Sequence, residues 1–345
     1  MTTGIVKDWR YLEHDMGPAH PESPDRLRAI YKMLEKDKAF SSFRIIEPRP
    51  ATGTEIELIH TKAYHDRIRQ TAGLERAYLD PDTSTSPKSY ETALLAAGGT
   101  LRAAEMIMEK KIDDAFALVR PPGHHAEASA ALGFCIFNNI AIAAQHLVRW
   151  VGLKRILIVD WDLHHGNGTQ HSFEDRDDVL YFSTHQFPHY PGSGHWGEAG
   201  KGKGEGFTVN VPLAAGKTDA DFLYIFRRLL APVARTFKPE FILVSAGFDI
   251  FAGDPLGGME LSVDGFGALA AELQGLARSL SAGRILYVLE GGYNLFGLRD
   301  GVGRVLLAMG NSNRIAASNA RVSASTGAEL APVFRTHKKY WPVEP

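Results

Sequence analysis

Nearly continuous apolar runs alternate along the chain with longer segments whose apolar residues recur at helical spacing. Strands of a sheet that helices cover on both faces carry apolar side chains at successive positions, because neither face meets water. The short runs therefore predict buried strands of a parallel sheet. We expect these strands at 114–119, 155–160, 178–183, 207–212, 240–247 and 284–292.

The longer segments predict helices that connect the strands, since their apolar residues recur every three to four positions. Ser262, directly before VDGFGALAAEL, is a suitable N-cap. The alternating order predicts an α/β fold, doubly wound, with a mostly parallel sheet and helices on both faces. The helices are expected at 88–110, 137–150, 218–237 and 262–279, with two more near 24–37 and 54–70 in a less regular N-terminal third.

The 345 residues fit one domain, although length alone would admit two. We expect a single domain over residues 1–310. Residues 311–345 begin with a polar stretch rich in small side chains, NSNRIAASNARVSASTG. They are expected to form a C-terminal extension that packs loosely on the domain or trails from it.

The net charge and the cysteine content limit the kinds of partner and metal site that we expect. The net charge is −2, so no basic surplus points to nucleic acid or an anionic membrane as the main partner. Cys135 is the only cysteine, which excludes an intramolecular disulfide and a thiolate-rich metal site. The first residues, MTTGIVKDWR, lack the apolar core of a signal peptide, and no apolar run reaches the ~18 residues of a membrane span. We therefore expect a cytoplasmic protein that does not contact membranes.

Polar residues follow four of the predicted strands at the point where each ends. In open α/β sheets, ligands bind beyond the carboxyl ends of the strands, so these loops should meet at one edge. The loops read RPPGHHAE, WDLHHGNG, FDIFAGDP and EGGYN.

Asp162 and His164 stand one residue apart, so an extended chain would turn both side chains to the same side. Asp249, after another strand, is a natural third ligand. Three nitrogen and oxygen ligands plus water describe a catalytic zinc site, although Mn(II) or Fe(II) would also suit the set. The alternative is that Asp162 and His164 form a buried hydrogen-bonded pair.

The adjacent His124 and His125 lie in a stiff Pro-Pro-Gly turn. Two neighbouring imidazoles suit general base and general acid chemistry near neutral pH; the alternative is a pair of surface histidines. Tyr293 follows two glycines, and its phenol is suited to donate to a developing oxyanion. Its alternative role is packing under a glycine-rich turn.

As a set, in order and at these spacings, the motifs resemble the histone deacetylase superfamily, from about residue 4 to 310. The residues within these motifs, particularly Asn167 and EGGYN, resemble those of the class II branch and its bacterial amidohydrolase relatives. The resemblance implies the arginase/deacetylase fold and zinc-dependent hydrolysis of acetamides. The motifs are RPPGHHA (120–126), GFCIFNN (133–139), DWDLHHGNGT (160–169), SAGFDIFAGDPLGG (245–258) and EGGYN (290–294), with HPESPDRL (20–27) and DPDTSTSPKSYETAL (80–94) upstream.

The resemblance implies one zinc ion per chain, with Asp162, His164 and Asp249 as its ligands. Two further residues would orient the histidines: Asp160 by hydrogen bonding to His124, and Asn167 by hydrogen bonding to His125. The residues it implies for catalysis are His124, His125, Tyr293, Asp160 and Asn167. We favour His125 as the base, because its neutral partner Asn167 would not hold it protonated.

The resemblance also implies an acyl-lysine channel, with Arg26 in an internal cavity behind it. Its substrate-binding residues would be Phe134, Tyr190, Leu256, Gly133, Gly292 and, at the rim, Asp82. One or two structural potassium ions are implied as well. The first site would use Asp160, Asp162, His164, Ser183 and Thr184, and the second would use carbonyls of Phe173, Arg176, Val179 and Phe207.

The expected substrate is an N-acetylated lysine or a related small acylated amine. An acetylpolyamine remains an alternative, although the short connection between Tyr64 and Tyr90 favours an open channel. A binuclear manganese ureohydrolase such as arginase is less well supported, since those enzymes carry D-x-H-x-D and this chain has D-x-D-x-H. A non-catalytic acyl-ligand binder is the other alternative, and the sequence is compatible with an oligomer.

The remaining polar motifs have plainer interpretations. GKGKGEG (200–206) lacks the context of a phosphate loop and is expected to be a flexible rim loop. The segment 185–196, with three histidines, is expected to line the channel rather than bind a second metal. We expect His165 and Cys135 to pack in the core, and Asp254 to orient its loop.

Overall fold

The computed structural model describes residues 2–310 and 322–344. Its centre is a sheet of eight strands, all parallel, in the order β2-β1-β5-β10-β9-β6-β7-β8. A short antiparallel hairpin, β3 (Ala77–Tyr78) with β4 (Ser84–Thr85), lies outside it. The sheet strands are β1 (Thr3–Val6), β2 (Arg44–Ile46), β5 (Asp114–Ala117), β6 (Ile156–Asp160), β7 (Val179–Gln186), β8 (Thr208–Leu213), β9 (Phe241–Ala246) and β10 (Ile285–Leu289).

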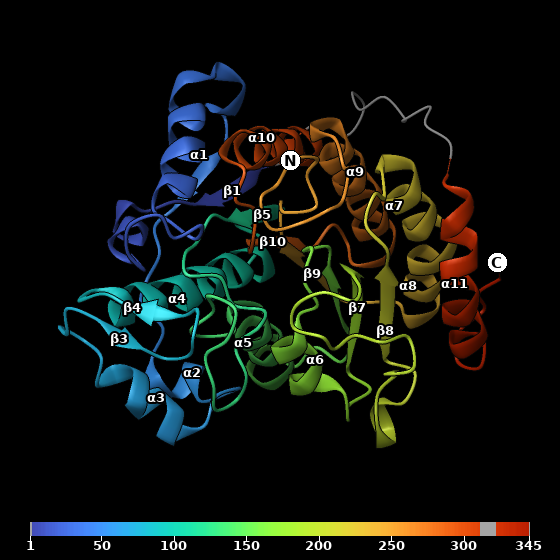
Figure 1. Cartoon of the computed structure of the whole chain (residues 1–345), viewed down its shortest axis with the longest axis horizontal. Coiled ribbons are helices and arrows are strands. Elements are labelled where there is room, and N and C mark those ends of the chain that lie inside the picture. The colour runs from blue at the N-terminus through green and yellow to red at the C-terminus, as the bar shows by residue number, and fades with distance from the viewer. Residues whose placement is uncertain (1, 311–321, 345) are drawn as a thin grey trace.

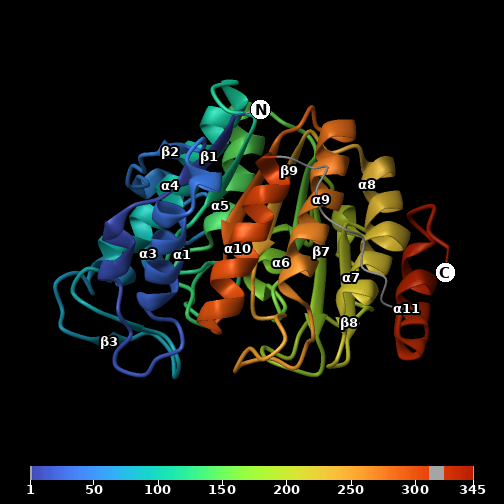
Figure 2. The same ribbon diagram turned by 90° about the horizontal axis from the view of Figure 1, so that it is seen from above.

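Helices cover both faces of the sheet (Figure 1). Figure 2 looks onto one layer: α1 (Asp25–Lys36), α7 (Asp219–Ile225), α8 (Ala231–Phe237), α9 (Val263–Leu280) and α10 (Leu295–Gly310). The other side carries α2 (Gly53–Ile56), α3 (Lys62–Arg69), α4 (Ser89–Met108), α5 (Asn139–His146) and α6 (Asn167–Phe173). In the described part of the chain, no helix has the length and apolarity needed to cross a bilayer.

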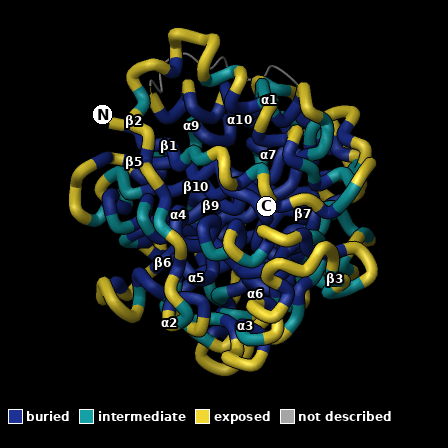
Figure 3. The backbone as a smooth tube through the Cα atoms, turned by 90° about the vertical axis from the view of Figure 1, so that its left-hand side faces the viewer, coloured by how far each residue is buried: buried dark blue, intermediate teal, exposed yellow. Residues whose placement is uncertain are grey.

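The central strands owe their continuous apolar pattern to this double cover. Every residue of β6, β9 and β10 is buried, and Figure 3 shows the inner strands enclosed by more exposed loops. Each buried Val, Leu or Ile side chain stabilises the fold by roughly 1.5–3 kcal/mol. The buried core therefore holds these strands, and the loops that follow them, in fixed positions.

The predicted α/β architecture is confirmed, and each of the six predicted strands is present. Ser262 caps α9, because its side chain accepts a hydrogen bond from the Gly265 amide at 3.1 Å. The single helix predicted near 54–70 is wrong: α2 and α3 are separate, since Thr61 caps a new helix by accepting from the Tyr64 amide. Strands β1 and β2 were not predicted, and they are only four and three residues long.

The described C-terminal residues form α11 (Ala324–His337) and a short tail that pack beside β8. Lys217, just after β8, donates to Ser325 and to Glu329, each at 2.7 Å. The Trp341 indole donates to the Gly206 carbonyl at 2.8 Å. α11 therefore lies along the last strand of the sheet, and the earlier part of the expected extension, residues 311–321, lies outside the described residues.

Candidate active site

Four loops that follow β5, β6, β9 and β10 come together at the carboxyl edge of the sheet. These strands are consecutive in the sheet, in the order β5-β10-β9-β6, so their ends are neighbours. The loops carry His124, Asp162, Asp249 and Tyr293 in turn. Residues far apart in the sequence thus lie together at the carboxyl edge of the sheet, as we expected for these loops.

Asp162, His164 and Asp249 form a buried triad. The Nδ1 of His164 lies 3.1 Å from Oδ1 of Asp162 and 3.1 Å from Oδ2 of Asp249. One ligand atom from each residue lies within 4.8 Å of the others. The remaining carboxylate oxygens are held by the backbone, because the Gly291 amide donates to Asp162 and the Leu163 amide donates to Asp249. The donors are therefore fixed in place.

The charge of this triad fits a divalent cation. Burial raises the pKa of Asp249 to about 7, and the charge of Asp162 adds to the effect. Burial opposes protonation of His164, but its hydrogen bonds to Asp162 and Asp249 outweigh this and raise its pKa to about 9. Without a metal, protons must balance the two buried carboxylates, and a metal ion would displace them. Nitrogen and oxygen donors without a thiolate suit Zn²⁺ and other first-row divalent ions.

His124 is paired with a carboxylate. Its Nδ1 lies 3.1 Å from Oδ2 of Asp160, which also accepts from the Tyr181 hydroxyl at 3.0 Å. Burial opposes the charge on His124, but Asp162 and Asp160 outweigh it and raise its pKa to about 10. This histidine is therefore the cationic member of the pair.

His125 is paired with an amide instead. Its Nδ1 lies 2.8 Å from Oδ1 of Asn167, whose Nδ2 donates to the His125 carbonyl and to Glu127. These donor bonds fix the amide so that its oxygen faces the ring. Burial and the neighbouring His124 hold the pKa of His125 well below its usual range. His125 is therefore neutral, with Nδ1 as donor and Nε2 free to accept a proton.

Tyr293 is held from two sides. Its backbone amide donates to Asp254 at 2.7 Å, and the Arg26 guanidinium lies 5.0 Å from the centre of its ring. Burial raises the pKa of the phenol well above its usual range, so the hydroxyl keeps its proton. Asp254 also accepts from the Asn294 and Leu256 amides, and so ties the two loops together, as predicted for an orienting residue.

Glu290 is a residue of this site to which the sequence assigned no role. Its carboxylate is buried and accepts from the Gly123 and His124 amides at 2.7 and 3.1 Å. Burial raises its pKa to about 7, although the cationic His124 lowers it. Glu290 fixes the backbone of the histidine pair. Its position directly after β10, inside the quoted EGGYN motif, was the available signal.

A cavity of about 260 Å³ reaches His164 of the triad and His125 of the histidine pair. The Phe134 and Tyr293 rings meet edge-on at 5.8 Å, and Tyr190 meets His125 at 5.1 Å. The cavity thus has a polar floor and largely aromatic walls. Its lining residues are Asp82, His125, Gly133, Phe134, His164, His189, Tyr190, Leu256 and Tyr293.

Two positions differ from the expected channel set. His189 lines the cavity, stacks on His164 at 5.4 Å and hydrogen-bonds to the Leu256 carbonyl. The sequence indicated only that its segment lines the channel. Gly292 does not line the cavity: its carbonyl accepts from Arg26, and a side chain there would collide with Phe248. Gly292 therefore shapes the loop from behind.

The rim of the cavity is built on a strained residue. Phe134 has a φ of 69°, in the left-handed region that bulky side chains rarely adopt. Its amide donates to the Thr83 hydroxyl, which donates to Asp82 at 3.0 Å. His20 packs edge-on against Phe134 and hydrogen-bonds to the Asp82 carbonyl. These contacts hold the aromatic wall and the rim carboxylate as one unit.

The residues expected around potassium fall into two groups. Asp160, Asp162 and His164 lie at or just beyond the carboxyl end of β6, beside Ser183 and Thr184 of β7, and the buried Thr184 hydroxyl has no hydrogen-bond partner among the described residues. The second group surrounds the turn between α6 and the start of β7. Its members are Phe173, Arg176, Val179 and Phe207, of which Phe173 and Phe207 already accept backbone hydrogen bonds at their carbonyls.

His165, His185 and Cys135 lie buried in the core. His165 is buried between Ser193 and Gln170, and His185 between Ser183 and the Gly194 carbonyl. Cys135 is fully buried. Both ring nitrogens of His165 and of His185 thus have hydrogen-bond partners within the fold.

Arg26 is fully buried. It pairs with Glu22 at 3.0 Å and donates to the Gly292 and Glu290 carbonyls. Arg120 pairs with the same Glu22 at 2.7 Å. One carboxylate thus serves two guanidinium groups directly behind the Tyr293 loop.

Comparison with known proteins matches residues 20–309 to the histone deacetylase domain. A probable deacetylase of Archaeoglobus fulgidus is 41% identical over 86% of this chain and 83% of the relative. The polyamine deacetylase HDAC10 of Danio rerio is 42% identical over 81% of this chain, but this chain spans only 43% of that relative. The crystal structure of the HDA15 HD domain covers 99% of this chain and 97% of that one, with a TM-score of 0.93 and 36% identity.

These relatives support a deacetylase function, that is, hydrolysis of an acetylated amide. The family match spans most of the sequence, and the fold agrees over almost the whole chain. The chain belongs to the histone deacetylase family.

Proposed function

We propose that this protein is a zinc-dependent deacetylase acting on N-acetylated lysine or a related acylated amine. The observation that carries the proposal is the convergence of the buried Asp162–His164–Asp249 triad with the histidine pair at the floor of one aromatic-walled cavity. The donor set fits zinc, and the aromatic walls of the cavity fit the methylene chain of a linear side chain.

A bound zinc ion would supply Lewis acidity toward the acetamide carbonyl and lower the pKa of a water molecule. His125, neutral and with Nε2 free, is the residue that removes the proton of the attacking water. Asn167 keeps the ring in the tautomer that this step needs.

His124 holds a positive charge beside Asp160 and is suited to donate a proton to the leaving amine. The two histidines lie with ring centres 4.0 Å apart, so their titrations are linked. Tyr293 keeps its phenolic proton and donates it in a hydrogen bond to the carbonyl oxygen as negative charge develops.

The substrate class follows from the cavity. Phe134 and Tyr190 offer aromatic faces to a methylene chain, and Leu256 adds an aliphatic contact. Asp82 at the rim could accept hydrogen bonds from a peptide backbone or pair with a second ammonium group. The second arrangement keeps an acetylpolyamine as an alternative, which the likeness to a protein named polyamine deacetylase also favours.

The remote alternatives are less well supported. A binuclear manganese ureohydrolase needs more carboxylate ligands than the two that the triad offers. A non-catalytic acyl binder would not need an oriented pair of histidines with opposite protonation states. Structural potassium at the two expected groups, and a cytoplasmic location, belong to the same proposal.

A substrate panel with the zinc-loaded enzyme tests the function. Acetyl-lysine peptides, trifluoroacetyl-lysine, acetylspermidine and acetylputrescine are compared, with Asp249→Asn as the inactive control. We expect turnover of acetyl-lysine peptides and one zinc per chain. If the folded, zinc-loaded protein hydrolyses the amide bond of none of these substrates, the proposal is wrong.

A further inference from the structure

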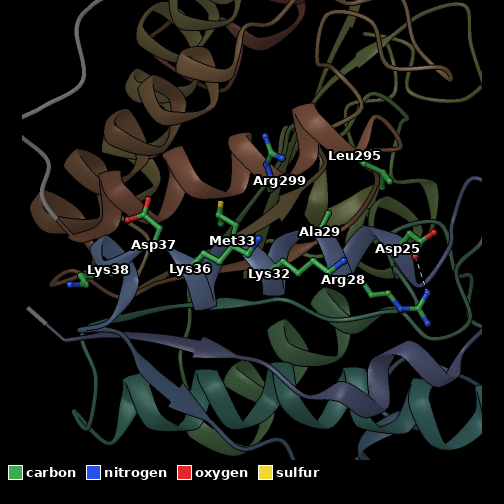
Figure 4. Close-up of a pocket in the computed structure, with 10 residues that line it drawn as sticks. All are labelled: Asp25, Arg28, Ala29, Lys32, Met33, Lys36, Asp37, Lys38, Leu295 and Arg299. Atoms are coloured by element: carbon green, nitrogen blue, oxygen red, sulfur yellow. Dashed lines mark hydrogen bonds and ion pairs between the residues drawn. The ribbon is translucent and has the colours of Figure 1, made fainter.

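A second, larger cavity lies outside the active site, between α1 and α10. Its volume is about 870 Å³, and it shares no lining residue with the channel (Figure 4). Residues of α1 and its C-terminal end form one wall, and Leu295 and Arg299 of α10 form the other. We call this cavity the α1–α10 groove.

The groove is strongly basic, although the protein as a whole carries a net charge of −2. Five cationic side chains and two carboxylates line it. Arg28 pairs with Asp25 at 2.8 Å, and Arg299 pairs with the neighbouring Asp300. Among the described residues, no carboxylate lies within ion-pair distance of the three remaining cations, which are Lys32, Lys36 and Lys38. The groove therefore keeps an excess of positive charge, carried by these three lysines.

Arg28, Lys32 and Lys36 form a regular row along α1. Residues four apart lie on the same helix face, about 6 Å from one to the next along the axis. All three side chains are exposed. The row therefore follows the length of the groove rather than converging on one point, as a site for a small anion would require.

The wall beside this row is partly apolar. Ala29 and Met33 of α1 turn toward α10 and are half-buried, and Leu295 closes one end (Figure 4). A ligand that fits both features has carboxylates on one side and apolar side chains on the other. A polypeptide with acidic residues every four positions has this form as a helix.

The groove opens at the same edge of the sheet as the active site. Leu295 stands two residues after Tyr293, and Arg26, next to Asp25, donates to the Glu290 and Gly292 carbonyls of the catalytic loop. The groove runs from that edge along the outer side of the molecule. A chain whose acetylated side chain enters the channel could thus continue into the groove.

We propose that the α1–α10 groove binds an acidic, amphipathic segment of the acetylated polypeptide substrate. This proposal rests on the deacetylase function proposed above. The chain between α10 and α11 is not a suitable occupant, because residues 311–321 contain two arginines and no carboxylate. The groove would select polypeptide substrates by a sequence that lies outside the channel.

Direct binding tests the groove independently of catalysis. The probe is an unacetylated fluorescein-labelled peptide of about 14 residues, or four helical turns, with Glu at every fourth position along one helix face and Leu on the opposite face. We expect the triple variant Arg28→Gln/Lys32→Gln/Lys36→Gln to weaken its binding about tenfold, since each exposed ion pair contributes little by itself. The matched control, Lys154→Gln/Lys338→Gln/Lys339→Gln, removes three exposed lysines elsewhere and should bind like the wild type.

Two further binding measurements test whether the groove recognises acidic peptides specifically. A peptide with Lys in place of Glu should bind poorly to the wild type and better to Lys32→Glu/Lys36→Glu. A single-stranded oligonucleotide of equal charge should bind more weakly than the acidic peptide. Equal loss of peptide binding in both triple variants, or tighter binding of the oligonucleotide through the same residues, overturns the proposal.

Kinetics then connect the groove to substrate choice. An acetyl-lysine peptide that continues into the acidic segment should show a KM severalfold below that of its Glu→Gln counterpart, with similar kcat. This difference should vanish in the groove triple variant, while turnover of a short neutral peptide stays unchanged. If no acetylated peptide is hydrolysed, the proposed function is wrong. The binding experiment would still show whether the groove binds the acidic peptide. If acidic and neutral peptides have equal KM with the wild type, the groove plays no part in selecting substrates.

Discussion

Asn167 places its amide oxygen 2.8 Å from Nδ1 of His125, where the neighbouring His124 has the carboxylate of Asp160 at 3.1 Å. The same ring position thus faces a neutral partner in one histidine and an anionic partner in the other. Against the effect of burial, Asp162 and Asp160 raise the pKa of His124 to about 10. Burial and the neighbouring His124 hold the pKa of His125 well below its usual range, and Asn167 adds no negative charge that would reverse this. In the proposed mechanism, this difference gives the base role to His125 and the acid role to His124.

Replacing the neutral partner should move the pH profile. Asn167→Asp, combined with Glu127→Gln so that the new carboxylate meets an amide donor, should raise the pKa of His125. Since the base must be unprotonated, the acid limb of kcat/KM should shift upward by roughly one to two pH units. Glu127→Gln alone is the control. An acid limb that stays in place in the double variant would show that His125 is not the base.

Removing the Tyr293 hydroxyl should slow the chemical step. Tyr293→Phe keeps the ring between Arg26 and Phe134 but loses the donor to the oxyanion. We expect kcat to fall by about 10²–10³-fold with little change in KM. Tyr190→Phe, which alters a wall residue of the same cavity, should lose far less. Comparable turnover in the two variants would contradict the oxyanion role.

Metal removal should destabilise the wild type more than it destabilises Asp249→Asn. Chelation should abolish wild-type activity and lower its Tm, because the buried carboxylates of Asp162 and Asp249 lose their counter-ion. In Asp249→Asn, one buried charge is absent, so the metal-free variant should melt at a higher temperature than the metal-free wild type. Calorimetry with and without zinc checks this crossover. A metal-free variant that melts below the metal-free wild type would argue against a cation site.

Glu22 should be a strong contributor to stability above mildly acidic pH. Burial raises its pKa, but Arg120 and Arg26 outweigh this and hold it at about 2. Its folded pKa lies below the ordinary value, so its contribution is present above pH ~4.5 and is lost as the pH falls toward 2.

Glu22→Gln leaves two buried guanidinium groups without their carboxylate and should cost about 3–5 kcal/mol in urea unfolding near pH 7. The exposed Glu75→Gln is the control. The difference between Glu22→Gln and the wild type should shrink in acid. A difference that stays constant from pH 7 to pH 3 would mean that the charge of Glu22 is not the cause.

The parts of the fold that could be predicted from sequence are those with a repeating pattern. Each of the six continuous apolar runs forms a strand. The loops at the ends of four of these strands carry the triad and the histidine pair. β2 was not predicted because Arg44 and Ile45 lie exposed at the sheet edge. A strand of three residues is also too short to show a recognisable apolar pattern. Glu290 and His189 act through the backbone and ring contacts of other loops, and no spacing in the sequence reveals such contacts.

The position of α11 beside β8 has a consequence for synthesis. β8 ends at residue 213, while the helix that lies along it begins at residue 324, near the C-terminus. At ~5–20 residues per second, the ribosome needs on the order of 5–20 seconds to add the intervening chain. During that interval the last strand of the sheet has no helix beside it. The nascent protein therefore passes through a period of exposure to strand pairing with other chains that the finished molecule no longer has.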